Sequence, residues 1–159
     1  NVQRIGAGTI ALGVASGATV LARDYLLDRC QFDRPLAEFQ GLQWILADMD
    51  TELAAARLLL LDAAASGILP DRIKAARAKL LSSETAIRVV DRALQMFGAA
   101  GYGSDTPLER MYRDVRMFTI GGGTAQVLRN QIAAHVLDRK LSQRSGTFDA
   151  GPRGDIAAQ

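Results

Sequence analysis

The stretch IKAARAKLLSSETAIRVVDRALQMF, from Ile73 to Phe97, decides the fold. Its apolar and small residues recur in steps of three and four, which is the spacing of one face of an α-helix. Arg and Lys residues fall mostly between these positions. A helix of this length with one such face needs neighbouring helices to cover it. The positions that define the face are Ile73, Ala76, Leu80, Ser83, Ile87, Val90, Leu94 and Phe97.

A second long amphipathic helix precedes this stretch. Its apolar residues again step by three and four, and it is expected to stop near Gly67 because Ser66, Gly67 and Pro70 supply the usual signals for a helix end and a new start. Its apolar face comprises Leu42, Ile45, Met49, Leu53, Ala56, Leu60 and Ala63.

The segment from Ile5 to Ala22 carries no charge and is just long enough for a membrane span to be considered. Its many glycine, serine and threonine residues weaken its affinity for lipid and allow another backbone to approach closely. No multi-lysine region precedes it, so a secretory signal is disfavoured. The segment is therefore predicted to be a buried helix, with no membrane span.

Two glycine clusters divide the rest of the chain. Gly98, Gly101 and Gly103 are expected to end the long helix, and Asp105 through Pro107 to cap a short helix over Leu108 to Phe118. Gly121-Gly122-Gly123 separates this helix from a last one, from about Thr124 to Leu141, with Thr124 as its cap and Leu128, Ile132 and Val136 on one face. The pattern predicts an all-α domain over residues 1–141 and a flexible tail over 142–159.

Composition excludes several functions. The formal net charge of +2 arises from interspersed signs, so no basic face indicates nucleic acid. With Cys30 as its one cysteine, the chain has no intrachain disulfide and no cysteine-based zinc site, which indicates a reducing, cytoplasmic location. Cys30 is interpreted as a small structural residue rather than a nucleophile.

Three local patterns combine residue types that suit a nucleotide ligand. Arginine beside an aromatic ring suits a pyrophosphate or an adenine, and a glycine-rich turn lets backbone N–H groups approach a phosphate. Each pattern alone is also an ordinary helix end. The patterns are Arg29-Cys30-Gln31-Phe32, the segment from Gln95 to Gly103, and Tyr112-Arg113-Asp114 followed by Gly122-Gly123-Thr124-Ala125-Gln126.

Taken together, their order and spacing resemble the C-terminal domain of the acyl-CoA dehydrogenases, from Arg4 to Leu141. The resemblance rests on Tyr25…Arg29-x-x-Phe32-x-x-Pro35…Phe39-Gln40, on Gln95…Phe97-Gly98…Gly101-Tyr102, and on Arg113-Asp114…Gly123-Thr124…Gln126…Arg129…Ile132-Ala133. It implies an antiparallel four-helix bundle that assembles as a dimer of dimers and holds FAD partly across a subunit boundary. The implied reaction is α,β-dehydrogenation of an acyl-CoA thioester, with electron-transfer flavoprotein as the acceptor.

The resemblance also implies a set of FAD contacts. Arg29, Gln31 and Phe32 would reach the pyrophosphate and adenosine of FAD bound mainly to a neighbouring subunit. Gln95 and Gly98 would lie near the same adenosine, and Thr124 and Gln126 would meet the flavin in their own subunit. One departure is Ala99, because many members carry a second glycine at this position. The methyl group of Ala99 would lie near the cofactor.

The family's catalytic base is missing. The reaction needs a carboxylate to remove the α-proton, and the family places it either directly before the Gly-Thr pair or on the first helix beside an arginine. Those positions are Gly122 and Gln3, before Arg4. The remaining candidates are better interpreted as ion-paired, solvated or surface residues: Asp114, Asp48, Asp50, Glu52 and His135.

Three hypotheses therefore stay open. The chain is a domain of a longer dehydrogenase whose base lies elsewhere, because the family's N-terminal helical and middle β-sheet domains are not represented in it. Alternatively, it resembles the non-catalytic chain of the two-chain dehydrogenases of steroid and lipid catabolism. The third hypothesis is a flavin-free helical module for homo- or hetero-oligomer assembly.

Overall fold

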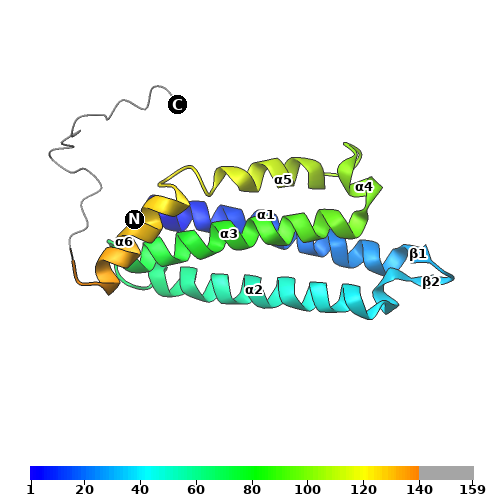
Figure 1. Cartoon of the computed structure of the whole chain (residues 1–159), viewed down its shortest axis with the longest axis horizontal. Helices are drawn as coiled ribbons and strands as arrows, with labels where there is room; N and C mark the ends of the chain where they lie inside the picture. The colour runs from blue at the N-terminus through cyan, green and yellow to red at the C-terminus, as the bar shows by residue number, and fades with distance from the viewer. Residues whose placement is uncertain (140–159) are drawn as a thin grey trace, which may run out of the picture.

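Helix α3, Arg72–Phe97, lies at the centre of a bundle of antiparallel helices. The computed structural model describes residues 1–139. The chain runs along α1 (Val2–Asp28), back along α2 (Gln40–Ala64), forward along α3 and back along α5 (Leu108–Met117), as Figure 1 shows. The predicted all-α, antiparallel four-helix bundle is confirmed. The predicted tail, residues 142–159, lies outside the described residues.

The start and end of α3 follow from local chemistry. The Asp71 side chain accepts hydrogen bonds from the Ile73 and Lys74 backbone N–H groups at 2.9 and 2.8 Å, a cap that contributes about 1 kcal/mol. At the other end Gly98 has φ of +59°, a conformation that favours glycine.

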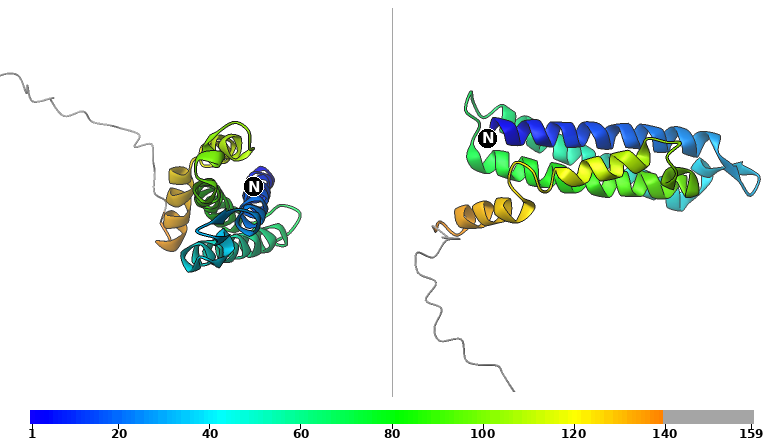
Figure 2. Two further views of the ribbon diagram at one scale, coloured as in Figure 1. Left: turned by 90° about the vertical axis from the view of Figure 1, so that its right-hand side faces the viewer. Right: turned by 90° about the horizontal axis from the view of Figure 1, so that it is seen from above.

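The single apolar face predicted for α3 is too narrow. In the end-on view of Figure 2 the other helices surround α3, so it is buried on nearly every side. Leu80, Ile87 and Leu94 are only half-buried, whereas residues outside the predicted face are fully buried. These include Ala75, Ala78, Lys79, Ser82, Thr85, Ala86, Val89 and Ala93.

Helix α1 packs against α3 through small residues. Ala11, Ala15, Ala18 and Ala22 are fully buried, and a Cβ at Gly8 would lie 3.4 Å from the Ser82 Oγ. By length and mean hydropathy (1.7), α1 qualifies as a membrane span. A core helix passes the same test, and the buried stripe along α3 supports the predicted bundle helix.

The apolar face predicted for helix α2 packs against the core of the bundle. Met49, Leu53, Ala56, Leu60 and Ala63 are buried, while Leu42 and Ile45 pack against the edge of the core. The helix ends at Ala64, and Gly67 follows with φ of +131°. The prediction for this helix is therefore confirmed.

A short antiparallel hairpin follows α1, and the sequence pattern did not predict it. Strands β1 (Cys30–Gln31) and β2 (Arg34–Pro35) pair, and the 3₁₀ turn η1 (Leu36–Glu38) leads into α2. The two linking residues, Phe32 and Asp33, have φ of +54° and +61°. Positive φ at both central positions is typical of a tight two-residue hairpin turn.

The segment after α3 differs from expectation in three ways. A one-turn helix, α4 (Ala99–Tyr102), follows Gly98. The cap expected from Asp105 is wrong, because Pro107 precedes α5 without a side-chain hydrogen bond. Helix α6 (Ala125–Val136) is capped by Thr124 as predicted but stops before Leu141, and Asp138 then has φ of +46°.

The fourth bundle position belongs to the short helix α5, which lies along α1 and α3. Helix α6 instead packs on the first half of α3, outside the bundle (Figure 2). The glycine-rich turn between α5 and α6 is thereby held against the start of α1 and α3.

Candidate functional site

Arg29, Gln31 and Phe32 lie together at the hairpin end of the bundle and are all exposed. Phe32 is 85% exposed although its backbone lies in the left-handed region, which is unfavourable for a bulky residue. Its ring meets that of Phe39 edge-on at 6.2 Å, and the Arg34 guanidinium lies 4.0 Å above Phe39. An exposed aromatic ring at the same end of the bundle as Arg29 is a surface that can receive a flat, anionic ligand.

Gln95 and Gly98 lie at the same end of the molecule, where α3 finishes. The Tyr25 and Phe97 rings stack 4.0 Å apart and join this end of α3 to α1. Gly101 is required locally, because a Cβ there would lie 2.7 Å from the Leu94 carbonyl oxygen. The structure therefore brings together five of the seven predicted FAD contacts.

Ala99, the departure from the double glycine, begins α4 and is exposed. It directly follows Gly98, one of the predicted adenosine contacts.

Thr124 and Gln126 lie at the opposite end of the molecule, at the start of α6 (Figure 1). Thr124 accepts a hydrogen bond from the Val127 N–H at 3.3 Å, and Gln126 is exposed. One chain does not bring these two residues near the hairpin set. The seven predicted contacts therefore fall into two separate groups.

The two expected base positions lie at the same end as Thr124. Gln3 is exposed on the first turn of α1, and Gly122 is exposed with φ of +70°. Arg4 links them: its Nη1 donates a 3.0 Å hydrogen bond to the Gln131 side chain, and its Nη2 lies 3.9 Å from where a Gly123 Cβ would be. Among residues 1–139, Arg4 forms no ion pair.

Lys79 is a polar residue at this end that sequence reasoning missed. It is 0% exposed, and its Nζ donates a 2.6 Å hydrogen bond to the Gly123 carbonyl oxygen. Burial lowers the pKa of the Lys79 ammonium, and the nearby charge of Arg4 lowers it further. The one available signal was its position among small residues, Ala75, Ala76 and Ala78, that α3 also buries.

The alternative acids do not form a proton-abstracting site. Asp114 pairs with Arg110, and Asp48 and Asp50 are exposed. Glu52 is not merely solvated, since it accepts hydrogen bonds of 2.8 Å from both Arg88 and Arg92.

His135 is exposed, as predicted. Cys30 is also exposed, on the hairpin that the sequence pattern did not predict. No group of three or more metal-ligating side chains occurs in the part of the chain that the structure describes.

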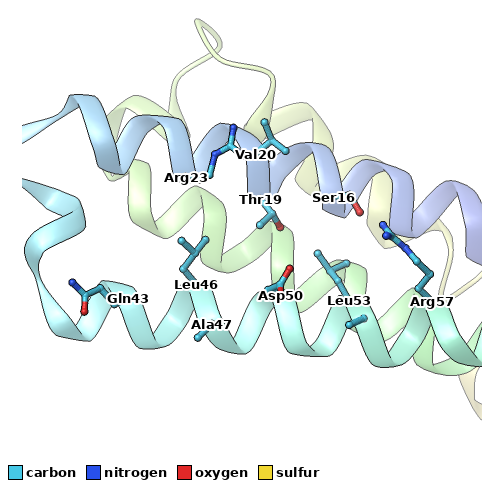
Figure 3. Close-up of a pocket in the computed structure, with 11 residues that line it drawn as sticks. Ser16, Thr19, Val20, Arg23, Gln43, Leu46, Ala47, Asp50, Leu53 and Arg57 are labelled. Carbon is cyan, nitrogen blue, oxygen red and sulfur yellow. The ribbon is translucent and has the colours of Figure 1, made fainter.

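A groove of about 560 Å³ runs between α1 and α2 (Figure 3) and contains none of the predicted site residues. Its walls include Val20, Leu46 and Leu53, with Thr19 and Asp50 between the helices. Further exposed apolar side chains lie on the same two helices, namely Val2, Ile10, Leu27, Trp44, Leu58 and Leu61.

The family model for "Acyl-CoA dehydrogenase, C-terminal domain" matches residues 1–137. The chain is 61% identical over 145 residues to a 3-sulfinopropanoyl-CoA desulfinase of Paraburkholderia xenovorans (strain LB400), covering 91% of this chain and 37% of that protein. It is 44% identical over 135 residues to the short-chain specific acyl-CoA dehydrogenase of Clostridium acetobutylicum, covering 84% and 36%.

Among solved structures, the butyryl-CoA dehydrogenase of Megasphaera elsdenii matches with a TM-score of 0.82 and 38% identity, over 84% of this chain and 36% of that one. The chain thus spans 36–37% of the length of these relatives.

Proposed function

The chain belongs to the acyl-CoA dehydrogenase family, and from this premise we propose that it is the C-terminal, FAD-binding domain of an enzyme that releases the sulfinate group of 3-sulfinopropanoyl-CoA. The observation that carries the proposal is the turn at Gly122, together with Gln3. Neither position supplies the carboxylate on which dehydrogenation of an acyl-CoA depends.

Loss of sulfinate needs no such base in its net balance. The C–S bond breaks, its electron pair ends in a new C–H bond, and the proton comes from water. The sulfur leaves as sulfur dioxide, which takes up the remaining hydroxide to give hydrogen sulfite. The organic product is propanoyl-CoA, and no external oxidant or reductant is consumed. The 61% identity to a protein named for this reaction, against 44% for a dehydrogenase, supports the assignment.

The residues present fit FAD. Arg29 and Gln31 offer a cation and an amide for pyrophosphate and ribose, and the exposed Phe32 ring offers a stacking face for adenine. Thr124 and Gln126 stand at the start of α6, where the partial positive charge of the helix N-terminus favours anionic groups. When bound, FAD would supply an electron-accepting ring system.

Two half-sites at opposite ends of one chain favour a cofactor shared between subunits. The exposed apolar side chains of α1 and α2, with the groove between them, supply a surface that a second copy would cover. We therefore include a dimer or tetramer in the proposal.

The test is a product assay on the native protein that carries this chain. Incubated with 3-sulfinopropanoyl-CoA, the protein should release sulfite and propanoyl-CoA in equal amounts, measured by chromatography. With butanoyl-CoA and an artificial electron acceptor it should form no unsaturated product. Ordinary dehydrogenation of butanoyl-CoA without sulfite release would reject the proposal.

A second candidate is a dehydrogenase whose base comes from another chain. A Cβ built on Gly122 meets nothing within 4 Å, so a partner's carboxylate has room there. This reading requires electron-transfer flavoprotein as acceptor, whereas desulfination does not. Dehydrogenation that appears only after a Glu-bearing partner is added, and that is lost when this Glu becomes Gln, would favour it.

A further inference from the structure

Lys79 is a buried cation to which the proposed function gives no role. Of the fully buried side chains among residues 1–139 it is the largest. It lies in the first half of α3 and reaches 44 residues along the chain to the Gly123 carbonyl oxygen, 2.6 Å from its Nζ. The bond therefore joins the central helix to the glycine-rich turn that holds the expected base position.

Packing alone does not explain an amine at this position. Burying an ammonium without a charged partner is costly, and Lys79 forms no ion pair within residues 1–139. Arg4, whose charge lowers the pKa of Lys79, has the same sign and opposes the buried cation. A methionine would fill the same space without that penalty. The hydrogen bond to Gly123 is what distinguishes lysine here.

That bond fixes a turn with little rigidity of its own. Gly122 and Gly123 have φ of +70° and +102°, and glycine has more backbone freedom than any other residue. The two ends of the turn are joined by a hydrogen bond, which the Ala125 N–H donates to the Thr119 carbonyl oxygen at 3.0 Å. At the start of the turn the Gly121 N–H donates to the Met117 carbonyl oxygen at 2.9 Å, and Lys79 adds a contact at Gly123.

The consequence reaches Thr124 through the peptide plane. The Gly123 carbonyl and the Thr124 N–H belong to one planar unit, so holding the carbonyl inward also sets the direction of the N–H. Gly122, directly before the restrained carbonyl, is exposed. One ammonium group thus restrains the peptide between the vacant base position and Thr124.

We propose that Lys79 is a positioning residue, which holds the Gly121–Gly123 turn so that Gly122 and Thr124 are correctly placed against the bound thioester and flavin. This inference rests on the proposed function, which puts both ligands at the turn. A displacement of about 1 Å at such a site costs on the order of a hundredfold in rate.

Hydrogen exchange tests the positioning directly and needs neither substrate nor flavin. The variant is Lys79→Met, and the matched control is Glu84→Gln. Glu84 ties α3 to α6 through an ion pair with Arg129 at 2.7 Å, which does not involve the turn. Exchange of the Ala125 amide should rise about tenfold or more in Lys79→Met and stay unchanged in Glu84→Gln. No change in Lys79→Met, or an equal rise in both variants, would overturn the inference.

Kinetics of the native, flavin-loaded protein supply the second readout. Lys79→Met should lower kcat about tenfold or more while KM for the acyl-CoA changes less than about threefold, because a misplaced turn affects the reacting geometry more than ground-state binding. Glu84→Gln should change neither. An unaltered kcat in Lys79→Met contradicts the inference.

Should Lys79→Met fail to fold, Lys79→Arg and Lys79→Gln decide. Arginine keeps a long cationic donor and should preserve more protection of the Ala125 amide than the shorter glutamine, and equal protection would overturn the inference. Sulfite release by the unaltered protein reports on the proposed function alone. The exchange measurement reports on Lys79 even if that release is absent.

Discussion

Arg4 donates a 3.0 Å hydrogen bond to the Gln131 side chain and so ties the first turn of α1 to α6. Arg4 also approaches Gly123, where its Nη2 lies 3.9 Å from the position of a Cβ. Gln3 and Gly122, the two positions at which the base is expected from the resemblance, therefore lie at one end of the molecule.

Gly122→Glu should restore only weak dehydrogenation of butanoyl-CoA. A loosely held carboxylate is expected to work about a hundredfold below a typical kcat of roughly 10 per second, and the positive φ of Gly122 costs a larger residue about 1 kcal/mol of stability. Dye-coupled assays and thermal melts measure both effects. Gly122→Gln is the control with the same shape and no base. Equal rates in the two variants would show that the carboxylate plays no part.

Phe32 and Asp33 make a matched pair in the hairpin turn. Both have positive φ, so replacing either with glycine should stabilise the fold by about 1 kcal/mol in urea titrations. Phe32→Gly should also lose flavin, seen as a lower ratio of visible to ultraviolet absorbance, because the stacking face is gone. Asp33→Gly should keep it. Full flavin retention in Phe32→Gly would remove this ring from the proposed site.

Glu52 predicts how stability depends on pH. Burial raises the pKa of its carboxyl, but hydrogen bonds and charges from Arg88 and Arg92 lower it by more, so the pKa lies below its usual value. The folded carboxyl therefore holds its proton less tightly than the unfolded one. Its stabilisation is present above the unfolded pKa and is lost as the pH falls through the folded pKa.

The matching variant is Glu52→Gln. It should be less stable than the parent by about 1 kcal/mol at neutral pH, with the difference vanishing in acid. Urea titrations from neutral pH downward follow this. A difference that is independent of pH would mean that the effect comes from packing rather than from charge.

Assembly is predicted from the exposed α1 and α2 surface. Val20 lines the groove between these helices and is itself exposed, so Val20→Lys should leave the monomer folded and place an unpaired charge in the interface. Sedimentation should show a dimer or tetramer for the parent and smaller species for the variant. Val136→Lys, which alters an exposed valine outside the groove, is the control. A monomeric parent at micromolar concentration would contradict the prediction.

The sequence predicted those helices whose spacing of apolar residues matches the face that they bury. The face of α2 was correct because one side of that helix meets the core. The face of α3 was too narrow because a central helix is covered on several sides, so small residues such as Ser82 are buried next to α1. The hairpin was missed because two-residue strands are too short to show alternation.

The site follows the same rule. Phe32 and Thr124 could be named from their resemblance to a family pattern, and the structure places Phe32 at an exposed position and Thr124 at a half-buried one, at opposite ends of the molecule. Lys79 was missed, since its position among alanines was the one signal in the sequence and a solvated lysine can have the same neighbours. The hydrogen-bond partner of Lys79 is Gly123, which lies 44 residues further along the chain and becomes its neighbour in the folded structure. The FAD contacts themselves remain predictions.

The central claim is that the enzyme cleaves a C–S bond without a base removing the α-proton. The most direct measurement is mass spectrometry of the propanoyl-CoA formed from 3-sulfinopropanoyl-CoA in deuterium oxide. The account predicts one deuterium at C3, where hydrogen replaces sulfinate, and none at C2. Deuterium at C2 above that of an enzyme-free control would show that a base exchanges the α-proton, and would contradict the account.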